Sequence, residues 1–166
     1  MSTARRVEDD HQLARLLQIG IVLEEVVEAR ASQHYRSLDP SERAELGGDV
    51  GDLLEYAATE SAEHRERLES LVDELDAESV AFEEIERLVA SKYGETGPED
   101  FDGVLYDQLH GEETAYKFYD DLIDAIEDSD ADFGIDRERL LSTLRSIRED
   151  EEAGVKAVTE LMGAME

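Results

Sequence analysis

The chain has 166 residues, of which 45 are acidic and 16 are basic, and its formal net charge is −29. This charge argues against nucleic acid and anionic membrane surfaces as partners, because both require a basic footprint on the protein. The absence of cysteine excludes disulfides, iron–sulfur clusters and thiol catalysis.

Apolar residues recur at helical spacing along nearly the whole chain, and the sequence predicts an all-α protein with a single domain spanning 1–166. Four long helices are predicted, at about 9–38, 49–76, 99–127 and 136–164. The segment Asp39-Pro40-Ser41-Glu42 has the features of a helix start, with a capping Asp, Pro at the first position and Glu three residues after the cap. We expect Gly47-Gly48 to break that short turn, so the second long helix is placed after it.

The connections between the predicted helices indicate the topology. The first and second helices are joined closely, as are the third and fourth, so each pair is expected to form an antiparallel hairpin. The segment 77–98 is long enough to run the length of a bundle, and Phe82 and Ile85 predict a short helix of its own at Val80–Tyr93. Two helix hairpins joined by one long crossover form the ferritin-like four-helix bundle, as opposed to a simple up-down-up-down bundle.

Each long helix carries an apolar stripe whose members are alternately three and four residues apart, which places them on one face. Near its middle each stripe is interrupted by a polar residue of metal-ligand type or its replacement, namely Glu24, Ser61 with His64, Glu112, and Glu151 with Gly154. A buried unpaired carboxylate is very costly. The recurrence of carboxylates at matching depth in several helices therefore indicates that they are paired with other groups or bind a cation.

Three segments carry a family resemblance, with the sequences LEEVVEA (23–29), AEHRERL (62–68) and GEETAYKFY (111–119). The first and last resemble the first and third helices of the ferritin-like superfamily, closest to its rubrerythrin-like branch. The second is similar to the segment around the histidine ligand of the second helix. The resemblance covers roughly 13–165. The family builds a di-iron or di-manganese site from one Glu on each of two helices and a Glu-x-x-His motif on each of the other two.

Carried over by position, the resemblance implies a reduced set of metal ligands. Glu24 and Glu112 match the single glutamates, and the Glu-x-x-His motifs fall on Ser61 with His64 and on Glu151 with Gly154. Each motif has lost one member, which leaves Glu24, His64, Glu112 and Glu151 as the expected ligands. Such a set suits one Zn²⁺, Mn²⁺ or Fe²⁺ ion. Four further carboxylates sit one position off the stripes and reach the interior if the helices rotate slightly: Glu25, Glu60, Glu113 and Asp150.

Two functions remain open on this reading. The first is a ferritin-like protein that binds a transition metal (iron, manganese or zinc) within the bundle and takes part in iron handling or oxidative-stress defence. The second is a metal-free ferritin-like scaffold for protein binding or assembly, in which Glu24 and Glu112 pair with His64 or with tyrosine hydroxyls as a structural polar layer. Whether the protein is an enzyme stays open. The resemblance implies a homodimer or a higher homo-oligomer.

The sequence also predicts the cellular location of the protein. No apolar run approaches the ~20 residues needed to span a bilayer, and the first ten residues lack the apolar core of a signal peptide. We therefore expect a cytoplasmic protein.

Only three of the 16 basic residues are lysines, and an acidic, lysine-poor surface is typical of cytosolic proteins of salt-loving archaea. At high salt, ions screen the repulsion between such charges.

Overall fold

The computed structural model describes residues 7–37, 40–75 and 101–164, with side chains described at 7–31, 33, 51–75 and 108–163. Within these ranges the chain forms four helices and no strand, which confirms the prediction of an all-helical fold with four long helices. The helices are α1 (Asp10–Ser37), α2 (Pro40–Glu74), α4 (Phe101–Glu127) and α5 (Arg137–Ala164). The predicted crossover 77–98 and its short helix Val80–Tyr93 lie outside the described residues.

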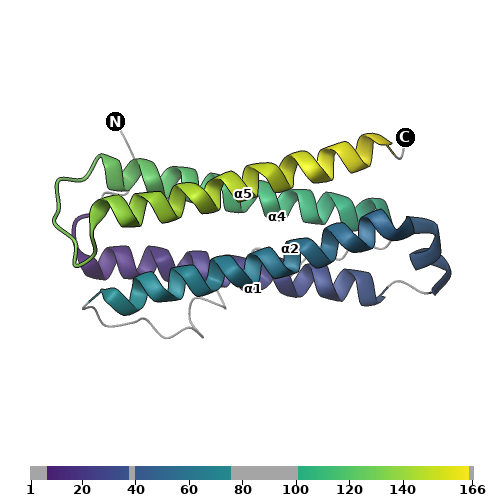
Figure 1. Cartoon of the computed structure of the whole chain (residues 1–166), viewed down its shortest axis with the longest axis horizontal. Coiled ribbons are helices and arrows are strands. Elements are labelled where there is room, and N and C mark those ends of the chain that lie inside the picture. The colour runs from purple at the N-terminus through teal and green to yellow at the C-terminus, as the bar shows by residue number, and fades with distance from the viewer. Residues whose placement is uncertain (1–6, 38–39, 76–100, 165–166) are drawn as a thin grey trace.

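The ends of the helices match the prediction with one exception. α1, α4 and α5 begin and end within about two residues of the predicted positions, which is the usual uncertainty of a helix end. α2 begins at Pro40 instead of near 49, so the prediction that Gly47-Gly48 breaks the helix is wrong. A glycine inside a helix costs only about 1 kcal/mol relative to alanine, and a proline at the first position favours helix from there. The ribbon of α2 does bend near its N-terminal end (Figure 1).

The four helices lie side by side along one long axis, with α1 and α5 running in one direction and α2 and α4 in the other (Figure 1). α1 packs most extensively against α2, and α4 packs against α5. Contacts of α1 with α4 and of α2 with α5 complete the bundle. None of the described helices combines the length and the apolar composition that a membrane span requires.

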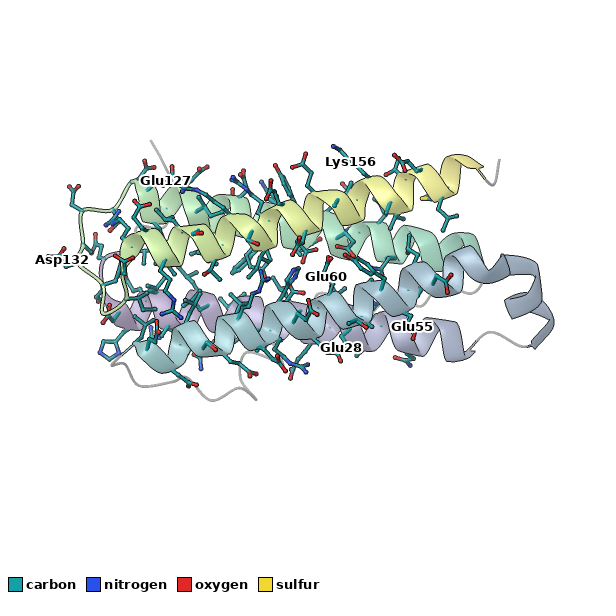
Figure 2. All side chains as sticks on the ribbon, viewed as in Figure 1. Glu28, Glu55, Glu60, Glu127, Asp132 and Lys156 are labelled. Atoms are coloured by element: carbon teal, nitrogen blue, oxygen red, sulfur yellow. The ribbon has the colours of Figure 1, made fainter. Side chains whose placement is uncertain are left out.

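The largest apolar cluster fills one half of the bundle, where the start of α1 meets the end of α2, the end of α4 and the start of α5. The predicted stripes supply many of its fully buried members, including Leu13, Leu17, Leu68, Ile126 and Leu144. Full burial of one such side chain contributes about 1.5–3 kcal/mol. Acidic side chains such as Glu127 and Asp132 lie on the outside (Figure 2). The apolar stripes therefore face inward, as predicted, and carry their polar interruptions into the bundle.

The connection between α4 and α5 is fixed by Arg137. Its guanidinium lies 5.7 Å from the centroid of the Phe133 ring and donates hydrogen bonds of 2.8–2.9 Å to the carbonyl oxygens of Ile126, Ser129 and Ala131. Asp136 accepts a hydrogen bond from the backbone N–H of Arg139 at 3.1 Å, which makes it the N-cap of α5. These contacts fix the register of α5 against α4, and with it the depth of the polar residues on both helices.

Candidate metal centre

The polar interruptions of the four stripes meet in one buried layer. Glu24 from α1, His64 from α2, Glu112 from α4 and Glu151 from α5 are each at most 3% exposed. Their depth follows from the stripes, because each lies on the inward face of its helix next to a buried apolar residue of the same stripe, namely Val27, Leu68, Ala115 or Ile147. The side chains of Ser61 and Gln108 are buried in the same layer. Seven-residue periodicity thus places ionisable groups from all four helices in the same interior.

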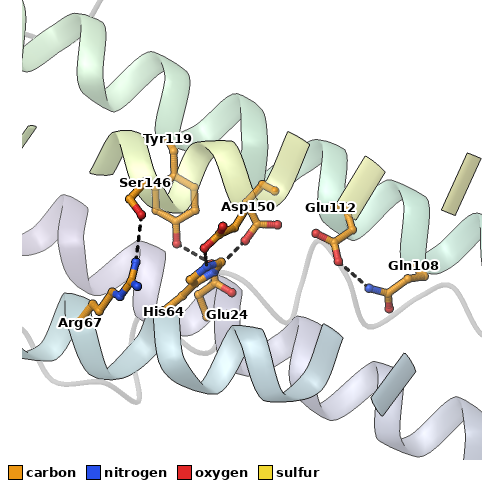
Figure 3. Close-up of polar contacts among 9 residues, drawn as sticks. Glu24, His64, Arg67, Gln108, Glu112, Tyr119, Ser146 and Asp150 are labelled. Atoms are coloured by element: carbon orange, nitrogen blue, oxygen red, sulfur yellow. Dashed lines mark hydrogen bonds and ion pairs between the residues drawn. The ribbon is translucent and has the colours of Figure 1, made fainter. Parts of the chain in front are cut away.

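His64 lies at the centre of the polar contacts in this layer (Figure 3). Its Nδ1 lies 3.3 Å from Glu24 Oε1 and 3.1 Å from Glu151 Oε1. Its Nε2 lies 2.9 Å from Asp150 Oδ2. The side chain of Asp150 is 40% exposed, whereas that of His64 is 1% exposed, so Asp150 links the buried ring to the surface. One imidazole therefore joins α2 to carboxylates of α1 and α5.

The carboxylates around His64 favour its charged form. Burial by itself lowers the pKa of this histidine, but hydrogen bonds to Glu24 and Asp150, together with the charge of Glu24, raise the pKa to about 9. With carboxylate oxygens next to both ring nitrogens, each nitrogen carries a proton and donates it. In the absence of a cation, His64 is thus an imidazolium that supplies a positive charge inside the layer.

Glu24 has one satisfied and one unsatisfied oxygen. Tyr119, which is fully buried, donates its hydroxyl proton to Glu24 Oε1 at 2.7 Å, and His64 Nδ1 approaches the same atom. Oε2 is buried and is the single buried side-chain polar atom without a hydrogen-bond partner in the described part of the chain. Because buried carboxylate oxygens are almost always hydrogen-bonded or bound to a cation, this atom marks a position where a positively charged ligand fits.

Glu112 and Glu151 are neighbouring buried carboxyl groups whose ionisation is coupled by proximity. Burial raises the pKa of both groups, and the proximity of Glu24 raises that of Glu151 further, to well above its ordinary range. Burial next to Glu24 and Glu112 therefore favours the protonated form of Glu151. Glu112 Oε1 accepts a hydrogen bond, at 2.8 Å, from Gln108 Nε2. The layer thus avoids repulsion between like charges by retaining protons.

Gly154 provides the space that Glu112 occupies. A Cβ atom added to this glycine would lie 2.6 Å from Glu112 Oε2 and 2.8 Å from its Cδ. Gly154 follows Glu151 by three residues on the same face of α5. The carboxylate of Glu112 therefore fills the volume into which a side chain at position 154 would project.

Three of the four predicted ligands come together as a possible metal-binding group. One ligand atom each from Glu24, His64 and Glu151 lies within 4.8 Å of the other two. Glu112 lies beside Glu151, next to this group, but is not a member of it. One imidazole nitrogen and carboxylate oxygens are donors that suit Mn²⁺, Fe²⁺ and Zn²⁺. The donor set and the unsatisfied oxygen of Glu24 both fit a divalent cation.

The carboxylates one position off the stripes behave differently from one another. Asp150 reaches the imidazole of His64, as described above. Glu60 is half-buried beside α5 (Figure 2), and burial raises its pKa to about 7. Glu25 instead lies near Arg65, with Oε1 4.0 Å from Nη1, and Glu113 is exposed. Asp150 thus hydrogen-bonds to a member of the metal-binding group.

Two residues of the layer were not predicted as part of a site. Gln108 lies on the same stripe as Glu112 and one turn before it, which is the spacing at which side chains on a helix meet. Tyr119 reads from the sequence as a core aromatic, and in the structure it is both core and hydrogen-bond donor. A polar amide inside an apolar stripe was the available signal for Gln108. For Tyr119 the signals were its position two turns after Glu112 and the expectation that the buried glutamates pair with tyrosine hydroxyls.

Comparisons with known proteins add no assignment to this geometry. No protein-family model matches the sequence, and neither a curated protein nor a solved structure shows significant similarity to the chain.

Proposed function

We propose that the protein binds a single divalent transition metal ion, Mn²⁺, Fe²⁺ or Zn²⁺, between its four helices. Glu24, His64 and Glu151 are the proposed ligands. The observation that carries the proposal is the buried Glu24 Oε2, which lacks a hydrogen-bond partner although it belongs to a group of converging ligand side chains. A cation in this group supplies the positive partner that the oxygen lacks.

The residues around the proposed ligands hold them in place by hydrogen bonds, as residues around metal ligands usually do. Asp150 accepts the Nε2 proton of His64, and this hydrogen bond leaves Nδ1, on the side of Glu24 and Glu151, free to bind the ion once its own proton has left. Tyr119 orients Glu24 through Oε1. Binding displaces protons from His64 and Glu151, so the ion replaces positive charge that the layer already holds. Iron or manganese would supply one-electron redox chemistry, whereas zinc has none.

The arrangement of the helices supports the broader part of the proposal, a ferritin-like bundle with a role in iron handling or oxidative-stress defence. α2 and α4 run in the same direction (Figure 1), so α2 ends and α4 begins at opposite ends of the bundle. This is what two helix hairpins joined by a long crossover require. The resemblance of residues 23–29, 62–68 and 111–119 to the rubrerythrin-like branch agrees with that topology, and with it we propose a homo-oligomer.

The test is to measure metal in the protein after purification without chelators, by elemental analysis, and to titrate the metal-free protein with Mn²⁺, Fe²⁺ and Zn²⁺ by calorimetry. We expect one ion per chain and a loss of binding in Glu24→Gln. Glu69→Gln, on the exposed face of α2, is the matched control. A protein that is isolated without metal and takes up none of the three ions would contradict the proposal.

The alternative is a metal-free scaffold whose polar layer fixes the register of the helices for binding a partner protein. It is favoured by the fact that both ring nitrogens of His64 already have carboxylate partners. In that case a chelator leaves the melting temperature unchanged, and added metal does not raise it. If the protein binds the ion instead, stoichiometric metal raises the melting temperature through linkage between binding and folding.

A further inference from the structure

We propose that Gly154 and Gln108 hold the carboxylate of Glu112 beside the metal-binding group, as a reserve ligand that stays off the ion. This inference rests on the proposed metal binding by Glu24, His64 and Glu151. It assigns Gly154 and Gln108 as positioning residues for a fourth carboxylate, which tightens metal binding only when it is released onto the ion.

Glu112 is fixed at both of its oxygens. Gln108, one turn earlier on α4, donates a hydrogen bond to Oε1 at 2.8 Å. Oε2 lies in the space above Gly154, so close that a Cβ atom there would be 2.6 Å away. One oxygen is thus held by an amide of its own helix, and the other occupies a space left by the neighbouring helix. Together these contacts keep the carboxylate outside the group formed by Glu24, His64 and Glu151.

Glu112 is nevertheless next to that group, because its carboxylate fills the space above Gly154, one helical turn from the ligand Glu151. Both side chains are buried, so a carboxylate that leaves its place above Gly154 has to find a partner within the layer. The partner with the strongest attraction for it is the metal ion bound by the adjacent Glu151. Removal of the space above Gly154 therefore moves Glu112 from a position beside the ion to a position on it.

Gly154→Ala is the most direct test, since the new methyl group meets the far end of the Glu112 side chain and displaces the carboxylate, not the backbone. Alanine also favours helix more than glycine does, so the variant should fold. Gly163→Ala is the matched control, because this glycine lies on the same helix and a Cβ there has no atom within 4 Å. The probes are Co²⁺ and Zn²⁺ added to the metal-free protein.

For Gly154→Ala we expect a changed Co²⁺ absorption spectrum and Zn²⁺ affinity higher by about tenfold, the size of effect typical of changes around a metal ligand. Gly163→Ala should match the native protein in both measurements. Gln108→Met, which removes the amide donor at similar side-chain length, should change the spectrum in the same direction. Addition of Glu112→Gln to Gly154→Ala should cancel the gain in affinity, because the reserve carboxylate is then lost.

Two results would overturn the inference while metal binding stands. One is a Gly154→Ala protein with the native Co²⁺ spectrum and Zn²⁺ affinity. The other is a drop of about tenfold or more in affinity on Glu112→Gln in the native background, since Glu112 would then already be a ligand. A native protein that binds neither Co²⁺ nor Zn²⁺ overturns the proposed function itself, and this inference with it.

Discussion

Glu24 Oε1 and His64 Nδ1 lie 3.3 Å apart across the interface of α1 and α2, and the second oxygen of the same glutamate has no hydrogen-bond partner. The pair is therefore only half satisfied. An imidazolium neutralises one side of the carboxylate, and the other side is left in the interior without a donor. A cation that binds both residues removes this cost, which makes Glu24 the residue whose charge matters most to the site.

Glu24→Gln should abolish tight metal binding while the helical fold is retained. The amide keeps the size of the side chain but loses the negative charge and one of the two ligand oxygens. We expect a drop in Zn²⁺ affinity of about 100-fold or more, in line with the removal of a ligand as opposed to a surrounding residue. Isothermal titration of metal-free protein measures it, with Glu69→Gln as control. Equal affinities in the two variants would exclude Glu24 as a ligand.

Metal affinity should rise with pH. Because His64 has its pKa raised to about 9, the proton on Nδ1 competes with the ion throughout the neutral range. We expect Zn²⁺ affinity to increase between about pH 6.5 and 9 and the titration to release protons. Calorimetry in buffers with different ionisation enthalpies counts the protons released. A Zn²⁺ affinity that is constant over this range would show that metal binding does not remove a proton from His64 Nδ1.

Asp150→Asn should weaken metal binding without removing it. Asp150 accepts the Nε2 proton of His64 at 2.9 Å, and the loss of its charge makes the ring a poorer ligand and orients it less well. A decrease in Zn²⁺ affinity of about 10-fold to 100-fold is expected. The adjacent Glu149, which is exposed, offers Glu149→Gln as the control. If both variants bind as the native protein does, Asp150 has no role at the site.

Most of the fold could be predicted from the sequence because apolar residues at helical spacing specify both the helix and its inward face. The same spacing placed Glu24, His64 and Glu151 in one layer. The start of α2 could not be predicted, because Gly47-Gly48 is a local signal and the rest of the helix outweighs it. The position of the Glu112 carboxylate outside the metal-binding group could not be predicted either. It depends on the space left by Gly154, which lies on another helix. Rotation of the helices decided that Asp150, and not Glu113, would reach the interior.

The metal-free protein should lose stability as pH rises. The pKa of His64 is raised from 6.5 to about 9, so its contribution to the free energy of unfolding is fully present below about pH 6.5 and is lost as pH rises through about 9. It amounts to roughly 3 kcal/mol. Glu60, with its pKa raised from 4.5 to about 7, acts in the same direction at lower pH.

Urea unfolding in the presence of a chelator, at pH 6, 7.5 and 9, measures this dependence. In His64→Gln the decline between pH 6.5 and 9 should be markedly smaller than in the native protein. His11→Gln, which replaces an exposed histidine, should retain the native decline. If His64→Gln and the native protein decline equally, the imidazolium is not what stabilises the metal-free layer.

Tyr119→Phe should destabilise the metal-free protein more than the metal-bound one. The hydroxyl of this fully buried residue donates to Glu24 Oε1 at 2.7 Å, and its removal leaves a buried carboxylate with one donor fewer, at a cost of about 1–3 kcal/mol. A bound ion satisfies the same carboxylate and reduces the loss. Urea unfolding with chelator and with excess Zn²⁺ gives the two values. Tyr116→Phe, on the same helix and partly buried, should change neither free energy of unfolding by more than about 0.5 kcal/mol. If Tyr119→Phe loses equal stability with and without Zn²⁺, Tyr119 has no role at the metal site.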